Sequence, residues 1–148
     1  MCVEPVVVAD IKVTRVEHGL NLEGDHGKAQ LRILGPGIVH VVYDGLAYAD
    51  FVPPILDVVN PKLAPDGLST LFVDAYALRS YETGFRQAWA TWLKDNESRL
   101  DPTVILFGSK LVHMGIALVN VVLRQPIVAV SEHADFDRRL QAALVAAR

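Results

Sequence analysis

Apolar and polar side chains alternate along the first third of the chain, which predicts strands with one face in water. Residues 11–16 and 29–34 follow this pattern, and residues 38–43 are predicted to form a further strand. Residues 19–27 are polar and rich in turn-forming residues, and we interpret them as the antiparallel partner of the first strand. A Gly-Pro-Gly turn at 35–37 separates the last two strands. This part of the chain is therefore predicted to be an antiparallel β-meander.

A short helix is predicted to follow the meander. Residues 44–45 (Asp-Gly) close the last strand, and Asp50 is placed to cap the helix. Pro53 and Pro54 then fall in the first turn, where backbone N–H groups have no partner within the helix and proline is tolerated. Asn-Pro at 60–61 ends this helix.

From residue 71 onwards, short apolar runs alternate with longer amphipathic stretches. Buried strands are predicted at 71–73, 103–107 and 126–130, and helices at about 82–98, at 110–123 and after an N-cap at Ser131. Strands joined by single helices of this length run parallel through right-handed crossovers. The predicted fold class is α/β, with a single mixed β-sheet whose N-terminal strands are antiparallel, whose C-terminal strands are parallel, and on which the helices pack. No linker or repeat interrupts it, which predicts one domain over 1–148.

Size and charge narrow the classes of function. A chain of 148 residues with 51% hydrophobic residues can bury one substantial core without a metal or disulfide. Its formal net charge is −3 and it has no run of Lys or Arg, so nucleic acid is not an expected partner. No uninterrupted apolar run reaches the roughly 18 residues of a membrane-spanning helix.

The cysteine count and the N-terminal residues point to a reducing compartment. Cys2 is the only cysteine, so neither an intramolecular disulfide nor a multi-cysteine metal site can form within one chain. The apolar stretch at 6–9 is too short for a signal peptide, and the acidic residues Glu4 and Asp10 stand where a basic leader would be expected. We expect a cytoplasmic protein.

The histidines are the first candidates for chemistry. His18 and His26 flank the acidic loop 23–25, which would hold a metal ion if the hairpin brought these side chains together. The favoured interpretation is a solvated turn, so no metal and no cofactor is predicted. His40 alternates with apolar neighbours and is expected to be half-buried or to face solvent.

Two junctions between a strand and a helix are candidate sites. At Ser109, backbone N–H groups at a helix N-terminus can hold an anion, although a simple cap is favoured because no Gly-rich phosphate loop is present. At the other junction, Ser80 is the expected N-cap, Thr83 is the competing choice, and either hydroxyl could accept a phosphoryl group. The candidate phospho-acceptor or ligand loop comprises Asp74, Ser80, Tyr81, Thr83, Ser109 and Lys110. No catalytic set is recognisable, and the chain is not predicted to be an enzyme.

The predicted helix at 110–123 is apolar on almost every side. Such a helix is either buried all round or covered by another molecule, and the sequence leaves both open. In the second case a homodimer or a contact with another protein is expected. The candidate interface residues are Leu111, Val112, Met114, Gly115, Leu118, Val119 and Val122. On the preceding helix, Trp89 and Trp92 are expected in the core.

The element order, together with residues 71–74, the junction at Ser80 and residues 104–109 and 127–131, resembles the STAS fold of anti-sigma factor antagonists and sulfate-transporter tails. The resemblance covers roughly residues 11–144 and implies a mostly non-catalytic regulatory family. In that family a serine in an Asp-Ser-Ser-Gly stretch is phosphorylated to release a partner kinase. Asp74 corresponds in place but the paired serine is missing, so the chain is more similar to stand-alone bacterial STAS-like proteins that associate with ligands or lipids.

Two hypotheses of function follow. The first is a non-catalytic regulatory or scaffolding domain in signalling, which acts through protein–protein interaction at helix 110–123. The alternative is a protein that binds a small ligand, namely an anion, a nucleotide or a lipid, at the C-terminal ends of the parallel strands.

Overall fold

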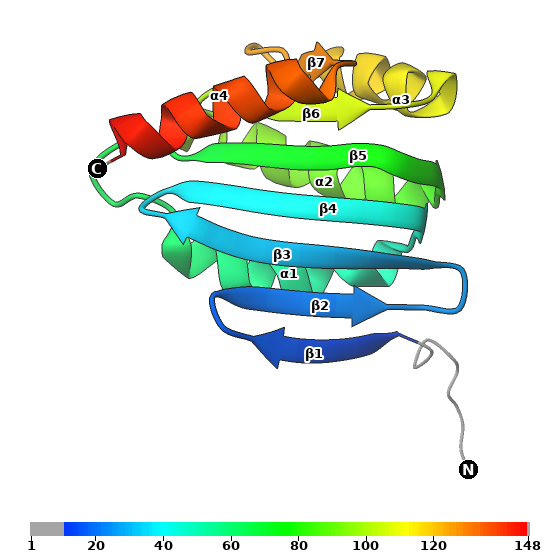
Figure 1. The fold of residues 1–148 in the computed structure, drawn as a ribbon. Helices are drawn as coiled ribbons and strands as arrows, with labels where there is room; N and C mark the ends of the chain where they lie inside the picture. The colour runs from blue at the N-terminus through cyan, green and yellow to red at the C-terminus, as the bar shows by residue number, and fades with distance from the viewer. Residues whose placement is uncertain (1–10, 148) are drawn as a thin grey trace.

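A seven-stranded mixed sheet forms the framework of the protein. The computed structural model describes residues 11–147, which fold into a sheet with strand order β1-β2-β3-β4-β5-β6-β7 (Figure 1). The predicted fold class is confirmed: the N-terminal strands are antiparallel and the C-terminal strands parallel. The predictions drawn from Cys2, Glu4, Asp10 and residues 6–9 lie outside the described residues.

The strands fall into a meander and a set of crossovers. The antiparallel meander consists of β1 (Lys12–Val16), β2 (Gly19–Glu23), β3 (Gly27–Gly35) and β4 (Ile38–Ala47). The parallel set continues from β4 with β5 (Thr70–Tyr81), β6 (Val104–Phe107) and β7 (Val128–Val130). Short turns force the first strands to be antiparallel, whereas the helical connections allow each later strand to return in the same direction.

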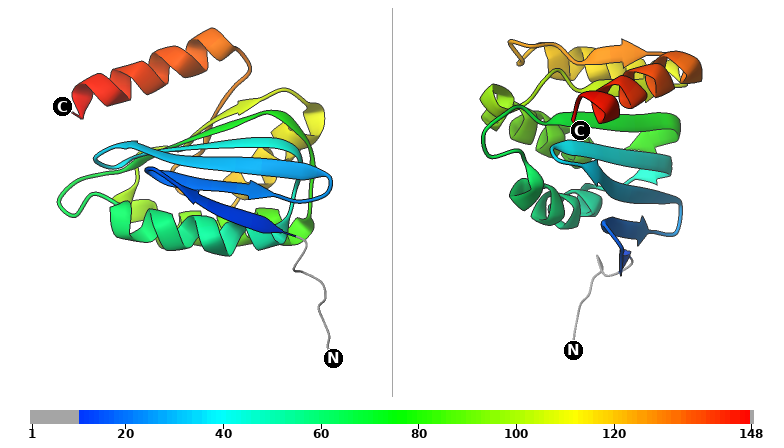
Figure 2. Two further views of the ribbon diagram at one scale, coloured as in Figure 1. Left: turned by 60° about the horizontal axis from the view of Figure 1, so that its bottom comes forward. Right: turned by 60° about the vertical axis from the view of Figure 1, so that its left-hand side comes forward.

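Helices cover the two faces of the sheet unequally. In chain order they are η2 (Ala49–Phe51), α1 (Val52–Val59), η3 (Asn60–Lys62), α2 (Thr83–Asp95), η4 (Glu97–Arg99), α3 (Lys110–Asn120) and α4 (His133–Ala146). The crossover helices α1, α2 and α3 lie on one face, and α4 lies alone on the other, as the left view of Figure 2 shows for α1 and α4.

The main core lies between the sheet and the three crossover helices. Its central side chains, such as Leu31 and Ile55, are fully buried. Trp89 and Trp92 belong to this core, as predicted. The Trp89 indole N–H donates to the Tyr43 hydroxyl at 3.1 Å, and burial raises the pKa of Tyr43 well above its usual range.

A second, smaller core lies under α4. Phe136 and Leu140 pack on Phe72 and its apolar neighbours in the parallel half of the sheet. Beyond α4 the same face over β1–β3 is polar: Arg32 donates to the Asn21 side chain at 2.8 Å and to the Leu20 carbonyl at 3.0 Å. Antiparallel strands commonly leave one face in water in this way.

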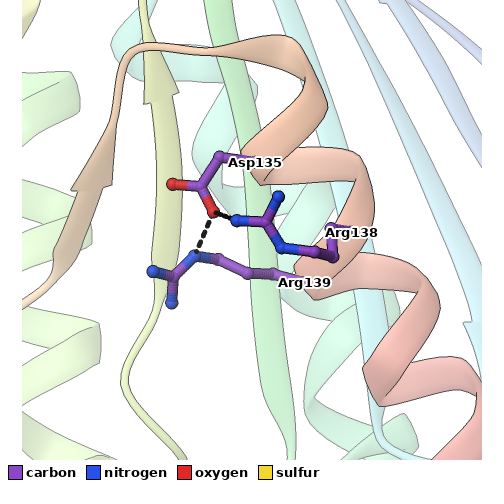
Figure 3. Close-up of polar contacts among 3 residues, drawn as sticks. All are labelled: Asp135, Arg138 and Arg139. Carbon is purple, nitrogen blue, oxygen red and sulfur yellow. Dashed lines mark hydrogen bonds and ion pairs between the residues drawn. The ribbon is translucent and has the colours of Figure 1, made fainter.

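The start of α4 differs from the expectation. Ser131 does not cap it; Glu132 holds the N-cap position and makes no capping hydrogen bond with its side chain. Instead, Asp135 in the first turn accepts hydrogen bonds from Arg138 at 2.6 Å and Arg139 at 3.0 Å (Figure 3). An acidic residue there is favourable toward the helix dipole, but pairs this exposed contribute at most about 1 kcal/mol.

Other boundaries are also shifted. The strand β4 continues past residues 44–45 to Ala47, with register irregularities. Asp50 lies inside η2, so it does not cap α1, which begins at Val52 after the 3-10 turn. The helices α2 and α3 end at Asp95 and Asn120, each three residues before the predicted ends.

Candidate functional site

The helix α3 has one buried and one exposed apolar face. Of the predicted interface residues, Val112, Gly115 and Val119 face the sheet and are buried. Those that remain exposed are Leu111 (43%), Met114 (63%), Leu118 (55%) and Val122 (49%), joined by Val121 (80%). One side of α3 therefore belongs to the core. The other side presents apolar residues, continued past the helix end by Val121 and Val122, that no element among residues 11–147 covers.

The exposed residues are spaced as in a helix that packs against another helix. Leu111, Met114, Leu118 and Val121 follow each other at intervals of three, four and three, which places them on one narrow stripe. We call these four residues the α3 seam. Exposed basic residues lie at both ends of it, Lys110 and Arg124, and residues 110–125 contain no acidic residue.

Local hydrogen bonds hold α3 in place at both ends. The Ser109 hydroxyl accepts a hydrogen bond from the Val112 backbone N–H at 3.3 Å, so Ser109 acts as the cap that the sequence favoured. At the other end, the Asn120 side-chain oxygen accepts from the Ile127 backbone N–H at 2.7 Å. The seam is thus presented on a helix with both termini fixed.

The second junction differs from the sequence prediction. Asp74, Ser80 and Tyr81 all lie within β5, which is twelve residues long, and Glu82 holds the N-cap position of α2 without a capping hydrogen bond from its side chain. Neither Ser80 nor Thr83 is the N-cap, although both are exposed. Ser80 lies six positions after Asp74 along the strand, a distance of about 20 Å. The predicted ligand loop is therefore spread along a strand.

Glu82 links the ends of β4 and β5, a role that the sequence did not suggest. Its side-chain oxygen accepts a hydrogen bond from the Ala49 backbone N–H at 2.6 Å, and its own N–H donates to the Ala47 carbonyl at 3.0 Å. The Glu82 carboxylate therefore makes a structural hydrogen bond at the junction where the sequence predicted a ligand.

An apolar cavity of about 90 Å³ lies between the sheet and helices α2 and α3. Its walls come from β4, β5, β6, the inward faces of the two helices, and Ile127. All lining residues are buried except Tyr81, Arg86 and Ile105, which are partly exposed. Of the predicted site residues, Tyr81, Val112, Gly115 and Val119 line this cavity.

Gly115 allows the Tyr81 side chain to lie close against α3. A Cβ atom at this position would lie 2.5 Å from the Tyr81 hydroxyl and 3.0 Å from its ring, closer than such atoms can approach. The Tyr81 side chain therefore lies directly over the α3 backbone. A glycine in the middle of an apolar helix was the one signal in the sequence for this close approach.

His40 lies beneath α4, on the other face of the sheet. Its ring centroid is 6.1 Å from that of Phe136. Burial lowers the pKa of His40 from 6.5, opposed by the nearby carboxylates of Asp74 and Asp137 and assisted by Arg32. The folded protein therefore favours the neutral form of the His40 imidazole more than the unfolded chain does.

Stability is expected to fall as the solution is acidified. Above pH 6.5, His40 is neutral in both the folded and the unfolded protein. Below pH 6.5, the imidazole of the unfolded chain takes up a proton more readily than that of the folded protein. The free energy of unfolding therefore decreases as the pH falls from 6.5 toward the lower pKa of His40 in the folded protein. Urea unfolding of the wild type and of His40→Leu across this range measures the effect. The variant should lose part of the pH dependence, whereas the control His18→Asn, at a side chain that is 72% exposed, should keep it.

The histidine loop shows no metal-binding arrangement. The His26 backbone N–H donates to the Tyr48 hydroxyl at 2.9 Å, and the His18 ring lies 3.3 Å from the Glu17 carboxylate. Over residues 11–147, no group of three or more His, Cys, Asp or Glu side chains is placed to hold a metal ion.

Comparison with known proteins supports the architecture. No family model and no curated protein matches the chain. Among solved structures, it is similar to an uncharacterized protein of the DUF3478 family from Shewanella loihica PV-4, described as having a SpoIIAA-like fold, with 9% sequence identity and a TM-score of 0.53. The match covers 88% of this chain and 91% of the other. The chain has a SpoIIAA-like fold.

The similarity supports the predicted STAS resemblance at the level of the fold. An identity of 9% carries no information on individual site residues. None of the helices described between residues 11 and 147 combines the length and apolarity needed to span a bilayer. The comparison shows the fold alone, and the function must be argued from the surface of the molecule.

Proposed function

We propose that this chain is a non-catalytic regulatory domain that binds a helix of another protein through the α3 seam. The observation that carries the proposal is the exposure of Leu111, Met114, Leu118 and Val121 at helix-packing intervals. A continuous apolar stripe of this kind on a folded domain is characteristic of a binding surface. The predicted cytoplasmic location would give such a partner access.

Charge favours a different protein over a second copy as the partner. In an antiparallel pair of α3 helices, Lys110 of one copy would approach Arg124 of the other, and residues 110–125 contain no carboxylate to balance them. A partner helix with acidic residues beside its apolar stripe would instead place opposite charges at both ends of the seam. The proposed partner is therefore an amphipathic helix with an acidic border.

The geometry gives less support to a small-ligand site at the ends of the parallel strands. Asp74 and Ser80 are far apart along β5, and the Ser109 hydroxyl serves as a helix cap. The apolar cavity likewise lacks the paired titratable groups of a catalytic site: Arg86 is its one charged lining residue. Both observations favour a binding domain over an enzyme.

A designed peptide tests the proposal. The probe is a fluorescent amphipathic helix with leucines at three- and four-residue intervals and glutamates beside them; its counterpart carries lysines in place of the glutamates. We expect the acidic peptide to bind more tightly, as measured by fluorescence anisotropy. Leu118→Glu should weaken this binding at least tenfold, because it places a carboxylate within the seam, where it would be buried and repel the acidic border.

Val145→Glu is the matched control. Val145 is 64% exposed on α4, on the opposite face of the sheet, so the same change of charge should leave binding unaltered. Equal binding of the two peptides, or equal loss in the two variants, would refute the proposal. Light scattering on the free protein tests whether a second copy of the chain binds the seam instead. A dimer that dissociates in the Leu118→Glu variant would show that it does.

A further inference from the structure

We propose that the Tyr81 hydroxyl determines the specificity of the α3 seam by donating a hydrogen bond to a carboxylate on one border of the partner helix. Tyr81 lies at the end of β5, outside the helix that carries the seam. The inference rests on the proposed function and deepens it, because it states which border of the partner is recognised by a hydrogen bond and which by charge alone.

The Tyr81 side chain is held between two helices. Its ring centroid lies 6.4 Å from that of Phe85 on α2, and the side chain packs against the main core. On α3, the missing side chain of Gly115 leaves room for the Tyr81 hydroxyl, which lies 2.5 Å from the position that a Cβ atom would occupy. The hydroxyl therefore has a defined position before a partner binds, and such pre-organisation lowers the entropy cost of binding.

The Tyr81 hydroxyl is not used within the fold. The hydroxyls of Tyr43 and Tyr48 accept hydrogen bonds at 3.1 and 2.9 Å, whereas the Tyr81 hydroxyl has no hydrogen-bond partner among residues 11–147. Tyrosine hydroxyls that are buried have such a partner as a rule. Because Tyr81 is partly exposed, we place its hydroxyl on the exposed side of the ring, where a bound protein can reach it.

Gly115 places this hydroxyl beside the seam. Gly115 follows Leu111 by four residues and precedes Leu118 by three, so it lies next to both on the helix surface. At 3.6 residues per turn, Gly115 and the exposed Lys110 fall on opposite sides of the seam. One border of the partner helix therefore meets the Tyr81 hydroxyl, and the other border meets the Lys110 ammonium group.

The two borders of the partner are recognised by different interactions. A hydrogen bond from the Tyr81 hydroxyl requires an acceptor at a short distance and in the right direction, and a carboxylate makes this bond about twice as strong as a neutral acceptor does. The attraction between Lys110 and a carboxylate acts over a longer distance and is weakened by salt. The partner helix can therefore bind in one orientation better than in the other.

Double-mutant cycles with the acidic peptide test this contact. Two derivatives of the peptide carry alanine in place of the glutamates on one border or on the other. Tyr81→Phe should weaken binding of the parent peptide about tenfold, the effect of losing one hydrogen bond to a charged group. The substitution should have no effect on the binding of one derivative only, and Lys110→Gln should have no effect on the binding of the other. Fluorescence anisotropy measures all of these affinities.

Tyr76→Phe is the matched control. Tyr76 belongs to the same strand and is 47% exposed, but its ring lies against His133 on α4, with the centroids 4.4 Å apart, on the opposite face of the sheet. Removing its hydroxyl should leave the affinity for the peptide unchanged. Tyr81→Phe should also leave the melting temperature unchanged, because the hydroxyl makes no hydrogen bond among residues 11–147.

The outcomes separate this inference from the proposed function. If the wild type binds the acidic peptide and Tyr81→Phe binds it equally well, the inference is overturned and the proposed function stands. Equal effects of Tyr81→Phe on both derivatives would also overturn it. A lower melting temperature of Tyr81→Phe would do the same, since the hydroxyl would then be bonded within the fold. A wild type that does not bind the acidic peptide refutes both.

Discussion

Replacing Phe136 with alanine should lower the free energy of unfolding by about 3–5 kcal/mol. Phe136 is 2% exposed and is one of two large anchors of α4. Its ring contacts Phe72 edge-on, with the centroids 5.9 Å apart. Because α4 is the only helix described on this face, few neighbours can move in to fill the space. Urea unfolding followed by circular dichroism measures the loss.

The control for this prediction lies on the same helix. Val145→Ala removes two methyl groups from a side chain that is 64% exposed, and it should change stability by less than about 0.5 kcal/mol. A loss for Phe136→Ala that is as small as that of the control would mean that α4 contributes little to the fold. The second core would then be only a loose contact between α4 and the sheet.

The architecture could be predicted because two different periodicities divide the chain. Alternation at residues 29–34 marks a strand with one face in water, and the apolar run at 103–107 marks a strand buried between helices. Both patterns reflect which side chains contact water, and the side chains that are buried in the structure agree with them. Element order and the change from antiparallel to parallel pairing followed from connection length.

The length of β5 could not be predicted for a physical reason. Beyond Ala75 the strand projects past the end of β6 and pairs only with β4, so Arg79 and Ser80 lie exposed on it. A strand that is hydrogen-bonded on one side and wet on its surface has no continuous apolar signal. The stretch resembled a loop, and the candidate site built on it was placed at the wrong kind of element.

The two faces of α3 and the cavity beneath it were beyond sequence analysis. Leu118 and Val119 are adjacent and equally apolar, yet one is 55% exposed and the other 7%. What separates them is the direction in which the helix packs on the sheet, which depends on distant contacts. The cavity is the space left after side chains from five elements have packed. The pattern of residues within any one element cannot predict such a space.

Replacing Gly19 with alanine should destabilise the protein by more than about 3 kcal/mol, at the upper end of single-substitution effects. A Cβ atom at this position would lie 1.8 Å from the Leu31 carbonyl oxygen, a backbone atom that cannot turn aside. Relief requires β2 and β3 to separate, and the next residue along, Leu20, is 2% exposed in the main core and pairs with Leu31. Urea unfolding measures the change.

Gly67→Ala is the appropriate comparison for this substitution. No atom lies within 4 Å of the Cβ position at Gly67, and the residue is exposed. Alanine there should be neutral or slightly stabilising, because it restricts the unfolded chain without meeting a neighbour. If both substitutions were tolerated equally, β2 and β3 could not have the pairing Gly19 with Arg32 that brings this glycine against the neighbouring strand. Since the buried face of the meander depends on that register, an error of one residue would turn Leu20 and Leu22 into water.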